Sequence, residues 1–560
     1  MRARTPINRR QDPAANRLTR VGMLAAWVSI GSFFYYLRRD EILMLGDSVA
    51  HINIARRVFD SLNPGLAQLG TVWLPLPHLL MIPFLLSDKM WQSGIGGSIP
   101  SMIAYVFGVV GIFRLVGILL EATGLPEPET QLPSSMAALV YAANPNLVYM
   151  QSTALTEPLY LVFFIWAVVY FADFAATWQK AGLQRMKPEQ GGADRALPPC
   201  AVFVTCAELT RYDGWFLGGV IGVLIASISV LHWNDRILRW SVLRFLIGIS
   251  LAPILWLVYN TAIYGNPLEF ANGPYSAKAI EQRVAAPNPA AHNLWDAASY
   301  FLKSAQITSA VGNWGRLWLL AAVIATALLV WKTQKQAIVG VAVLLWSPVV
   351  FYSLSLSYGS IPLHVPMWWP FAIFNQRFGL QLLPLFAVSA GLLITGLSTK
   401  GAGRHQWQVA VPAVLLIVAS YAFVWADKPL CWQEAWQNWE RRRGLDTAVG
   451  LALREFPPNS RFLMDITEHV GIMERLGIPL RRVVNNEDHR SWVRPTDPDG
   501  VWERALADPV RYVDFVIAFE GDLVDKGVNR TNLKLQEVIH SMDRPPARIY
   551  QVHASTDSSR

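Results

Sequence analysis

Long apolar segments recur along the first three quarters of the chain and constrain its fold more than any other feature. They lie near residues 21–37, 71–86, 99–120, 133–150, 156–177, 198–212, 214–231, 244–263, 316–331, 336–356, 378–398 and 409–425. Most of them approach the roughly 20 residues that a helix needs to cross the hydrocarbon core, where each backbone group must be hydrogen-bonded within its own segment. The sequence therefore predicts an α-helical polytopic membrane protein.

The composition agrees with membrane insertion and argues against nucleic-acid binding. Charged residues make up 16% of the 560-residue chain, whereas soluble domains carry about 25%. The net charge is +8, but six arginines fall in the tail 1–20, beside the first apolar segment. Such a tail is typical of a chain that sets its membrane orientation by positive charge. The three cysteines, Cys200, Cys206 and Cys431, are too scattered for a disulfide framework or a zinc site.

The basic segments also predict the direction of the chain. The tail 1–20 is expected in the cytoplasm, as are the short basic loops between later apolar segments. The outer face then carries the loops 38–70, 264–315 and 357–377 and the whole C-terminal region.

The number of crossings stays open on this reasoning. Three apolar segments separate Asp47 from Glu157, yet two residues on the same side require an even number of crossings. Either segment 71–86, which prolines interrupt, or segment 133–150 fails to span, or a crossing is hidden. The sequence predicts 11 or 13 spans, within a transmembrane domain at 21–426.

Residues 427–560 have a different pattern and are expected to form a soluble α/β domain outside the membrane. Short β-like segments alternate with helix-like ones, at 461–466, 481–486, 512–519 and 548–552. Acids follow three of these segments: Asp465, Glu468, Glu487, Asp488, Glu520 and Asp522. If the strands are parallel, the acids meet at one edge of the sheet, where His469 and His489 are possible metal ligands. Ordinary solvated loops are the alternative.

The first outer loop carries the most suggestive acid, Asp47. Apolar positions after it recur at helical spacing, which predicts an amphipathic helix at the membrane surface. A carboxylate at the lip of an apolar cavity suits a general base, since partial burial raises its pKa towards neutrality. His51 follows one turn later, and the guanidinium groups of Arg56 and Arg57 can hold a phosphate. Alternatively, these charges only face water and lipid headgroups.

Further candidates fall at other outer helix ends. His78 heads a proline-led segment and is either a cavity group or a hydrogen-bonded core residue. Glu157 is costly at the mouth of a span unless it is paired or wet, although an acid also suits the start of a helix. Arg211, followed by Tyr212, has acids nearby in sequence, whereas Arg377 has none and is expected to bind a phosphate.

The order of these motifs resembles the GT-C glycosyltransferases, in the branch that holds protein O-mannosyltransferases and the lipid A aminoarabinose transferase. The resemblance spans roughly residues 21–400. The matching segments are Asp47 in the first outer loop, Leu74-Pro75-Leu76-Pro77-His78, Thr156-Glu157-Pro158 after Asn144-Pro145, and Arg377-Phe378-Gly379-Leu380-Gln381-Leu382-Leu383-Pro384. The resemblance implies a helical bundle with a cavity that opens to the outer leaflet and admits a polyprenyl-phosphate sugar.

The chain departs from the family pattern in two places. The family's Asp-Glu pair is Asp47-Ser48 here, unless Asp40-Glu41 is the true match. The second acidic segment lacks Asp-x-Asp, which weakens a metal-dependent mechanism.

The resemblance implies roles for particular residues. Asp47 would act on the acceptor hydroxyl, with Glu157 as the second acid and Arg377 as a contact to the donor phosphate. The further expected substrate contacts are His51, Arg56, Arg57, His78, Arg211 and Tyr212.

The expected activity is an inverting, metal-independent transfer of a sugar from a polyprenyl phosphate to an extracytoplasmic acceptor hydroxyl. The acceptor is a glycan, lipid or protein, the location is the cell inner membrane, and no cofactor is expected. A transporter or flippase of a lipid-linked or anionic substrate, and a non-catalytic membrane scaffold, are the alternatives. Neither the sugar nor the acceptor is predicted.

Overall fold

Every apolar segment predicted from the sequence contains a helix in the computed structural model. The structure describes residues 13–183, 192–230, 235–273, 276, 278–279, 287–333, 336–359, 362–397, 404–488, 500–541 and 544–553. The helices that form the bundle are α1 (Pro13–Leu37), α3 (Leu76–Leu85), α5 (Ile95–Ala122), α6 (Glu127–Ala142), α8 (Glu157–Leu183), α9 (Leu197–Glu208), α10 (Tyr212–Val230), α11 (Arg236–Tyr264), α15 (Gly315–Thr333), α16 (Gln336–Ser357), α17 (Leu383–Leu397) and α18 (Arg404–Ala426).

Seven stretches among the described residues are long and apolar enough to cross a membrane, and three shorter apolar helices accompany them. The chain is therefore a multi-pass membrane protein, and the predicted fold class is confirmed. The number of 11 or 13 spans stays a prediction, because length and apolarity identify seven candidates.

Helix α3 accounts for the odd number of apolar segments between Asp47 and Glu157. It has 10 residues, so at 1.5 Å per residue it is about 15 Å long. The hydrocarbon core is about 30 Å thick. The helix in segment 71–86 is therefore too short to span by itself, and of the two later segments before Glu157, α5 is a candidate span.

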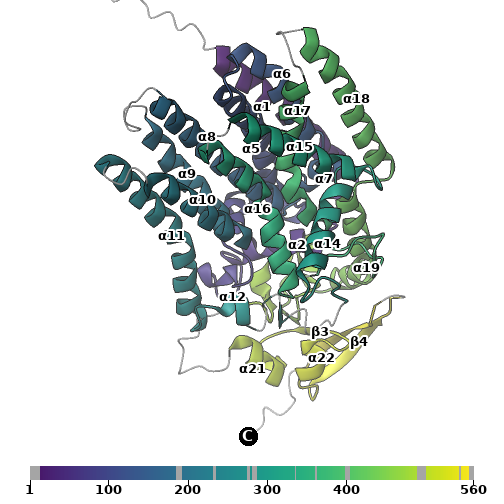
Figure 1. The fold of residues 1–560 in the computed structure, drawn as a ribbon. Coiled ribbons are helices and arrows are strands. Elements are labelled where there is room, and N and C mark those ends of the chain that lie inside the picture. The colour runs from purple at the N-terminus through teal and green to yellow at the C-terminus, as the bar shows by residue number, and fades with distance from the viewer. Residues whose placement is uncertain are drawn as a thin grey trace, which may run out of the picture.

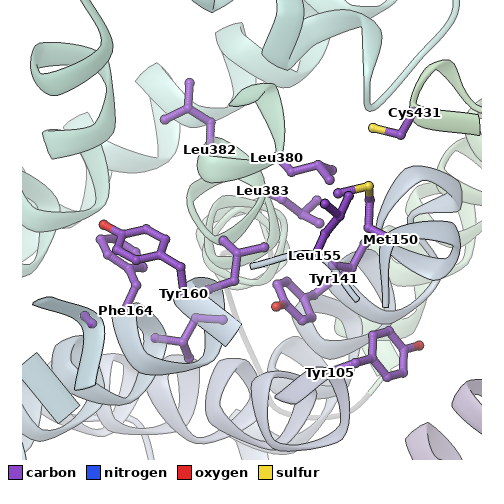
Figure 2. Packing of buried hydrophobic residues seen from close by; sticks show 14 of the residues in the cluster. Tyr105, Tyr141, Met150, Leu155, Tyr160, Phe164, Leu380, Leu382, Leu383 and Cys431 are labelled. Atoms are coloured by element: carbon purple, nitrogen blue, oxygen red, sulfur yellow. The ribbon is translucent and has the colours of Figure 1, made fainter. Parts of the chain in front are cut away.

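The centre of the bundle is formed by α5, α6, α8 and α17. Figure 2 shows buried side chains of these helices and of neighbouring segments packed together. Close helix contacts depend on glycines: a Cβ on Gly108 would lie 2.8 Å from the Tyr141 hydroxyl, and one on Gly391 would lie 2.8 Å from the Pro133 carbonyl. Small residues at such contacts are how helices approach each other in lipid.

The remaining described helices connect the bundle helices or belong to the C-terminal region. Helix α19 begins shortly after α18 and contacts α7, α2 and α20, so it belongs to the bundle as well as to the C-terminal region. These elements are α2 (Gly46–Arg57), η1 (Leu66–Leu69), α4 (Asp88–Gln92), α7 (Pro145–Met150), η2 (Ala193–Ala196), α12 (Glu269–Asn272), α14 (Leu294–Ile307), η3 (Gln376–Leu382), α19 (Leu430–Leu453), α20 (Val470–Leu476), η4 (Leu480–Arg482), α21 (Val501–Ala507), η5 (Pro509–Arg511) and α22 (Leu523–Gly527).

A five-stranded sheet lies at one end of the bundle (Figure 1). The strand order is β2-β1-β3-β5-β4; β1 pairs in parallel with β2 and β3, and β5 pairs antiparallel with β3 and β4. The strands are β1 (Phe462–Met464), β2 (Val483–Val484), β3 (Phe515–Phe519), β4 (Leu533–Ile539) and β5 (Ala547–Val552). The sequence did not predict β4, because this edge strand is largely exposed and lacks a buried apolar pattern.

Candidate active site

Asp47 lies in the first turn of α2, where the helix dipole favours a negative charge. The surroundings differ from the predicted surface helix: most side chains from Ser48 to Arg57 are buried, because α2 packs against α3, α5 and α20. Asp47 itself keeps 40% of its side chain exposed, and its Oδ2 lies 2.5 Å from Nη2 of Arg377.

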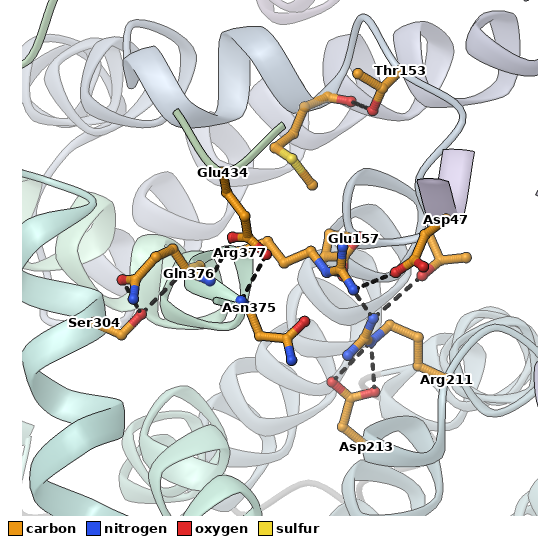
Figure 3. Close-up of polar contacts among 12 residues, drawn as sticks. Asp47, Thr153, Glu157, Arg211, Asp213, Ser304, Asn375, Gln376, Arg377 and Glu434 are labelled. Atoms are coloured by element: carbon orange, nitrogen blue, oxygen red, sulfur yellow. Dashed lines mark hydrogen bonds and ion pairs between the residues drawn. The ribbon is translucent and has the colours of Figure 1, made fainter. Parts of the chain in front are cut away.

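Arg377 joins Asp47 to a second acid (Figure 3). Its Nε lies 3.1 Å from Oε1 of Glu157. The same Oε1 accepts a hydrogen bond of 2.9 Å from Nη1 of Arg211. Two acids and two arginines from α2, α8, η3 and the turn before α10 therefore form one charged cluster, although Asp47 and Arg377 are 330 positions apart in sequence.

The far side of the cluster is closed by Asp213 and Tyr352. Nε of Arg211 lies 3.2 and 3.3 Å from the two oxygens of Asp213. The Tyr352 hydroxyl donates to Asp213 Oδ2 at 3.0 Å and accepts from Nη2 of Arg211 at 3.0 Å. These contacts hold the Arg211 guanidinium in one orientation.

Glu157 is buried, and its two oxygens differ. Oε1 forms ion pairs with both Arg211 and Arg377, whereas Oε2 has no hydrogen-bond partner within the part of the chain that the structure describes. A buried carboxylate oxygen without a partner is costly. It is therefore a ready acceptor for a donor group on a bound molecule.

No family model matches the chain, and no curated protein matches it. Among solved structures, ArnT from Cupriavidus metallidurans bound to undecaprenyl phosphate is similar, with a TM-score of 0.53 and 12% identity over 95% of this chain and 98% of that one. The apo state of the same protein gives a TM-score of 0.50 and 12% identity over 96% and 98% of the two chains. The chain has the GT-C fold.

A third solved structure is the oligosaccharyltransferase AglB from Archaeoglobus fulgidus, in complex with an inhibitory peptide and a dolichol-phosphate. It gives a TM-score of 0.43 and 10% identity over 90% of this chain and 70% of that one. The resemblance inferred from the sequence motifs is confirmed at the level of the GT-C fold by the likeness to ArnT.

In this GT-C bundle the pKa of Asp47 differs from the prediction. Burial raises it, as expected from the sequence, but Arg377 and further positive charge nearby outweigh burial and hold the pKa below its usual value. The predicted shift towards neutrality is therefore wrong. Asp47 is a carboxylate at neutral pH and is held in an ion pair.

His51 and His78 contact each other beside Asp47. His51 Nδ1 lies 2.9 Å from His78 Nε2, and both side chains are buried. The ring of Trp73 packs against His51 in a tilted arrangement, with centroids 4.6 Å apart. Burial lowers the pKa of His51 to about 4, so this imidazole is neutral at neutral pH.

Arg56 is held by groups other than the Asp47 cluster, contrary to the predicted phosphate contact. It bonds Asp60 at 2.9 Å, the carbonyl of Leu85 at 2.7 Å and Asp88 at 2.6 Å. These partners engage its guanidinium, and the phosphate contact of Arg56 stays a prediction.

Arg57 and Tyr212 also hold the fold together. Arg57 bonds Glu487 of the C-terminal region at 3.1 Å. The Tyr212 hydroxyl accepts from Trp256 at 3.2 Å, and its ring stacks on Phe270. Both residues had been predicted to contact substrate, and both have structural partners here.

The alternative acidic pair, Asp40 and Glu41, is not part of the cluster. Asp40 is exposed and has a positive φ of 59°. Glu41 is buried and bonds Arg39 at 2.8 Å and the indole of Trp432 at 3.0 Å. Asp47 is therefore the better match to the family's first acid.

The acids after the parallel strands pair with separate partners instead of gathering at one site. Strands β1, β2 and β3 are parallel, which is the arrangement that the predicted gathering of acids depended on. Each acid nevertheless has its own partner: Asp465 bonds Thr467, Glu468 bonds Arg544, Glu487 bonds Arg57, Asp488 bonds Asn63 and Gln68, Glu520 pairs with Arg548, and Asp522 bonds the first turn of α22. His469 pairs with Asp446, and His489 lies outside the described residues. Among the described residues no group of three or more His, Cys, Asp or Glu is placed to hold a metal ion.

Sequence reasoning missed two residues next to the cluster. Tyr352 orients Arg211, and Glu434 accepts from the backbone amides of Asn375 and Gln376, just before Arg377. Neither residue lies near its partner in sequence, so no local motif points to the contact.

Proposed function

We propose that the chain is an inverting glycosyltransferase that moves a sugar from a polyprenyl phosphate to an acceptor hydroxyl at the outer face of the membrane. The observation that carries this proposal is the pairing of Asp47 with Arg377 at 2.5 Å, beside Glu157 and Arg211. A base and two guanidinium groups at one end of a GT-C bundle are the parts that such a transfer requires.

The chemical step follows from this arrangement. The acceptor oxygen forms a bond to the anomeric carbon and loses its proton to Asp47, while the bond between that carbon and the phosphate oxygen breaks. The polyprenyl phosphate leaves with the electron pair. Arg377 and Arg211 stabilise the charge that develops on it, because guanidinium groups offer forked donors to phosphate oxygens.

Because Asp47 and Arg377 form an ion pair, binding of the donor phosphate also changes the basicity of Asp47. A donor phosphate competes with Asp47 for Arg377. Once the phosphate has taken the guanidinium, Asp47 loses its counter-ion, and its pKa rises towards the value that burial sets. Donor binding therefore activates the base, and the donor binds before the acceptor reacts.

Glu157 and His51 are the remaining proposed contacts with substrate. The unpartnered Oε2 of Glu157 accepts a hydroxyl of the sugar or acceptor. His51 lies one turn from Asp47 and is neutral, so it orients a hydroxyl without adding charge. His78 holds His51 in place. No metal is assigned a role, because the oxygens of Asp47 and Glu157 that face the cluster are engaged by arginines.

The proposed orientation is an N-terminus in the cytoplasm, with the sheet and the charged cluster outside the inner membrane. The arginine-rich tail 1–20 supports this direction. The sheet and the charged cluster lie at the same end of the bundle. Helix α2 carries Asp47 of the cluster, and its Arg57 bonds Glu487 of the C-terminal region.

The test is mass spectrometry of lipids that copurify with the full chain, followed by transfer from that lipid in the presence and absence of a chelator. The proposal predicts a polyprenyl-phosphate sugar and transfer that survives chelation. Loss of transfer on chelation would overturn metal independence. Movement of the intact lipid between leaflets without release of polyprenyl phosphate would instead establish a flippase.

A further inference from the structure

One face of α19 carries three polar residues at intervals of four: Glu434, Asn438 and Arg442. Residues at this spacing lie above one another on the same side of a helix. Each of the three bonds a backbone group that lies outside α19. The partners belong to the segments that carry Arg377 and Asp47.

Glu434 holds the segment that carries Arg377 (Figure 3). Its Oε1 accepts from the backbone amide of Asn375 at 2.7 Å, and its Oε2 accepts from that of Gln376 at 2.9 Å. These amides open η3, and Asn375 has a left-handed φ of 56°. The carboxylate thus supplies from a distant helix the cap that η3 lacks locally.

Asn438 and Arg442 hold the segment that carries Asp47. Oδ1 of Asn438 accepts from the amide of Gly46 at 2.9 Å, and Nη2 of Arg442 donates to the carbonyl of Met44 at 2.9 Å. A Cβ on Gly46 would lie 3.4 Å from Asn438 Oδ1, which is an ordinary contact distance. The residue after Gly46 is Asp47.

The same helix therefore holds both sides of the ion pair. Glu434 and Asn438 are one turn apart, about 6 Å along the axis. A helix does not stretch, so the two backbone segments are held at a fixed separation. Burial of a carboxylate costs free energy unless its oxygens accept hydrogen bonds. Both oxygens of Glu434 accept hydrogen bonds from the two residues that precede Arg377.

We propose that α19 is the positioning element of the active site, with Glu434 and Asn438 as positioning residues that set the separation of Arg377 and Asp47. The consequence for catalysis rests on the proposed function, whereas the consequence for the backbone does not. Neither residue touches substrate, and each acts through the segment that it bonds.

The first test measures the backbone by hydrogen exchange of the full chain in lipid nanodiscs. Glu434→Ala should speed amide exchange at 375–376 by about tenfold or more, since each amide loses its acceptor, while Gly46 is unchanged. Asn438→Ala should speed amide exchange at Gly46 and leave exchange at 375–376 unchanged. Asn438→Asp keeps the acceptor oxygen and should restore slow exchange at Gly46. Gln437→Ala, at an exposed position of the same helix, is the control.

The second test measures turnover of the same variants. Glu434→Ala and Asn438→Ala should lower kcat by about tenfold to a hundredfold, the cost of a small misplacement of reacting groups, with a smaller change in acceptor KM. Asn438→Asp should recover most of kcat, and Gln437→Ala should match the wild type. The variant Glu434→Gln, which keeps one acceptor oxygen, should fall between wild type and Glu434→Ala.

Exchange at 375–376 that is unchanged in both Glu434→Ala and Glu434→Gln would overturn the positioning role, as would faster exchange with unchanged kcat. If the wild-type protein transfers no sugar, the proposed function falls, and the exchange data still decide whether α19 holds the two segments.

Discussion

At the scale of single residues, the pairing of Asp47 with Arg377 sets the chemistry of the site. A carboxylate that is ion-paired has a low pKa and is a weak base, whereas the same carboxylate without its partner is a stronger one. Arg377 therefore lowers the basicity of Asp47 through this ion pair. Under the proposed function it also binds the donor phosphate.

Replacement of Arg377 separates these two effects. Arg377→Ala should lower kcat/KM by about 10²–10³, since it removes a cation from the developing phosphate charge. It also removes the group that lowers the pKa of Asp47, so burial then dominates and the pKa rises. The acidic limb of the pH profile of kcat/KM should move to higher pH. Arg377→Lys keeps the charge and should leave the limb in place; an unmoved limb in Arg377→Ala would contradict the pairing in solution.

The location of several charged residues at outer helix ends was predictable from sequence, whereas other contacts of the cluster were not. Asp47, Glu157, Arg211 and Arg377 were each assigned to outer helix ends, and the structure brings them together. The phosphate contact predicted for Arg56 stays a prediction, and its observed partner Asp60 lies four residues later in sequence, just beyond the end of α2. The roles of Tyr352 and Glu434 depend on contacts between distant segments, which periodicity does not contain.

At the scale of elements, the position of α2 depends on its close contact with the start of α5. A Cβ on Gly97 would lie 2.4 Å from Cγ1 of Ile52 and 2.7 Å from Cβ of Ala154. Even one methyl group therefore requires Ile52 of α2, or its neighbour Ala154, to shift.

We expect Gly97→Ala to destabilise the protein by about 1–3 kcal/mol, the usual cost of overpacking, and to lower transfer because α2 carries Asp47. Thermal unfolding in detergent measures the first effect. Gly219→Ala is the matched control: this glycine lies in α10, a Cβ there would meet nothing within 4 Å, and alanine favours the helix. Equal melting temperatures for wild type and Gly97→Ala would show that α2 and α5 are not in close contact.

The contact between α2 and α20 gives stability a pH dependence. Glu474 is fully buried and accepts a 2.6 Å hydrogen bond from Asn53. Burial raises its pKa from 4.5 to about 8. The Glu474 carboxyl therefore binds a proton more tightly in the folded state than in the unfolded state. Its contribution to the free energy of unfolding is lost as the pH rises from 4.5 to about 8.

Glu474→Gln removes this titration and should flatten the fall in melting temperature between pH 5 and about pH 8. The variant should be more stable than the wild type at the alkaline end of that window. Melting curves at a series of pH values measure the effect, and parallel curves for the two proteins would contradict it.

At the scale of the whole molecule, the apolar segments were sufficient to predict the membrane bundle, because burial in lipid requires helices of sufficient length. The short α3 shows why the crossings could not be counted from the sequence: ten residues form a helix that does not span. The sheet was predicted from its buried strands, whereas β4 was missed because an exposed edge strand needs no apolar pattern. Helix α19 contacts both the bundle and the C-terminal region, and these contacts between distant segments cannot be predicted from the sequence pattern.

The most direct test of the proposed function is sugar transfer by the Asp47→Asn variant of the full chain, with Asp40→Asn as control. Asp40 is exposed and has a positive φ that asparagine tolerates, so its variant should fold and transfer normally. Asp47→Asn should retain the copurifying donor lipid and lose transfer by at least about 10²-fold, the contribution of a general base. Transfer at the wild-type rate by Asp47→Asn would show that Asp47 is not the base.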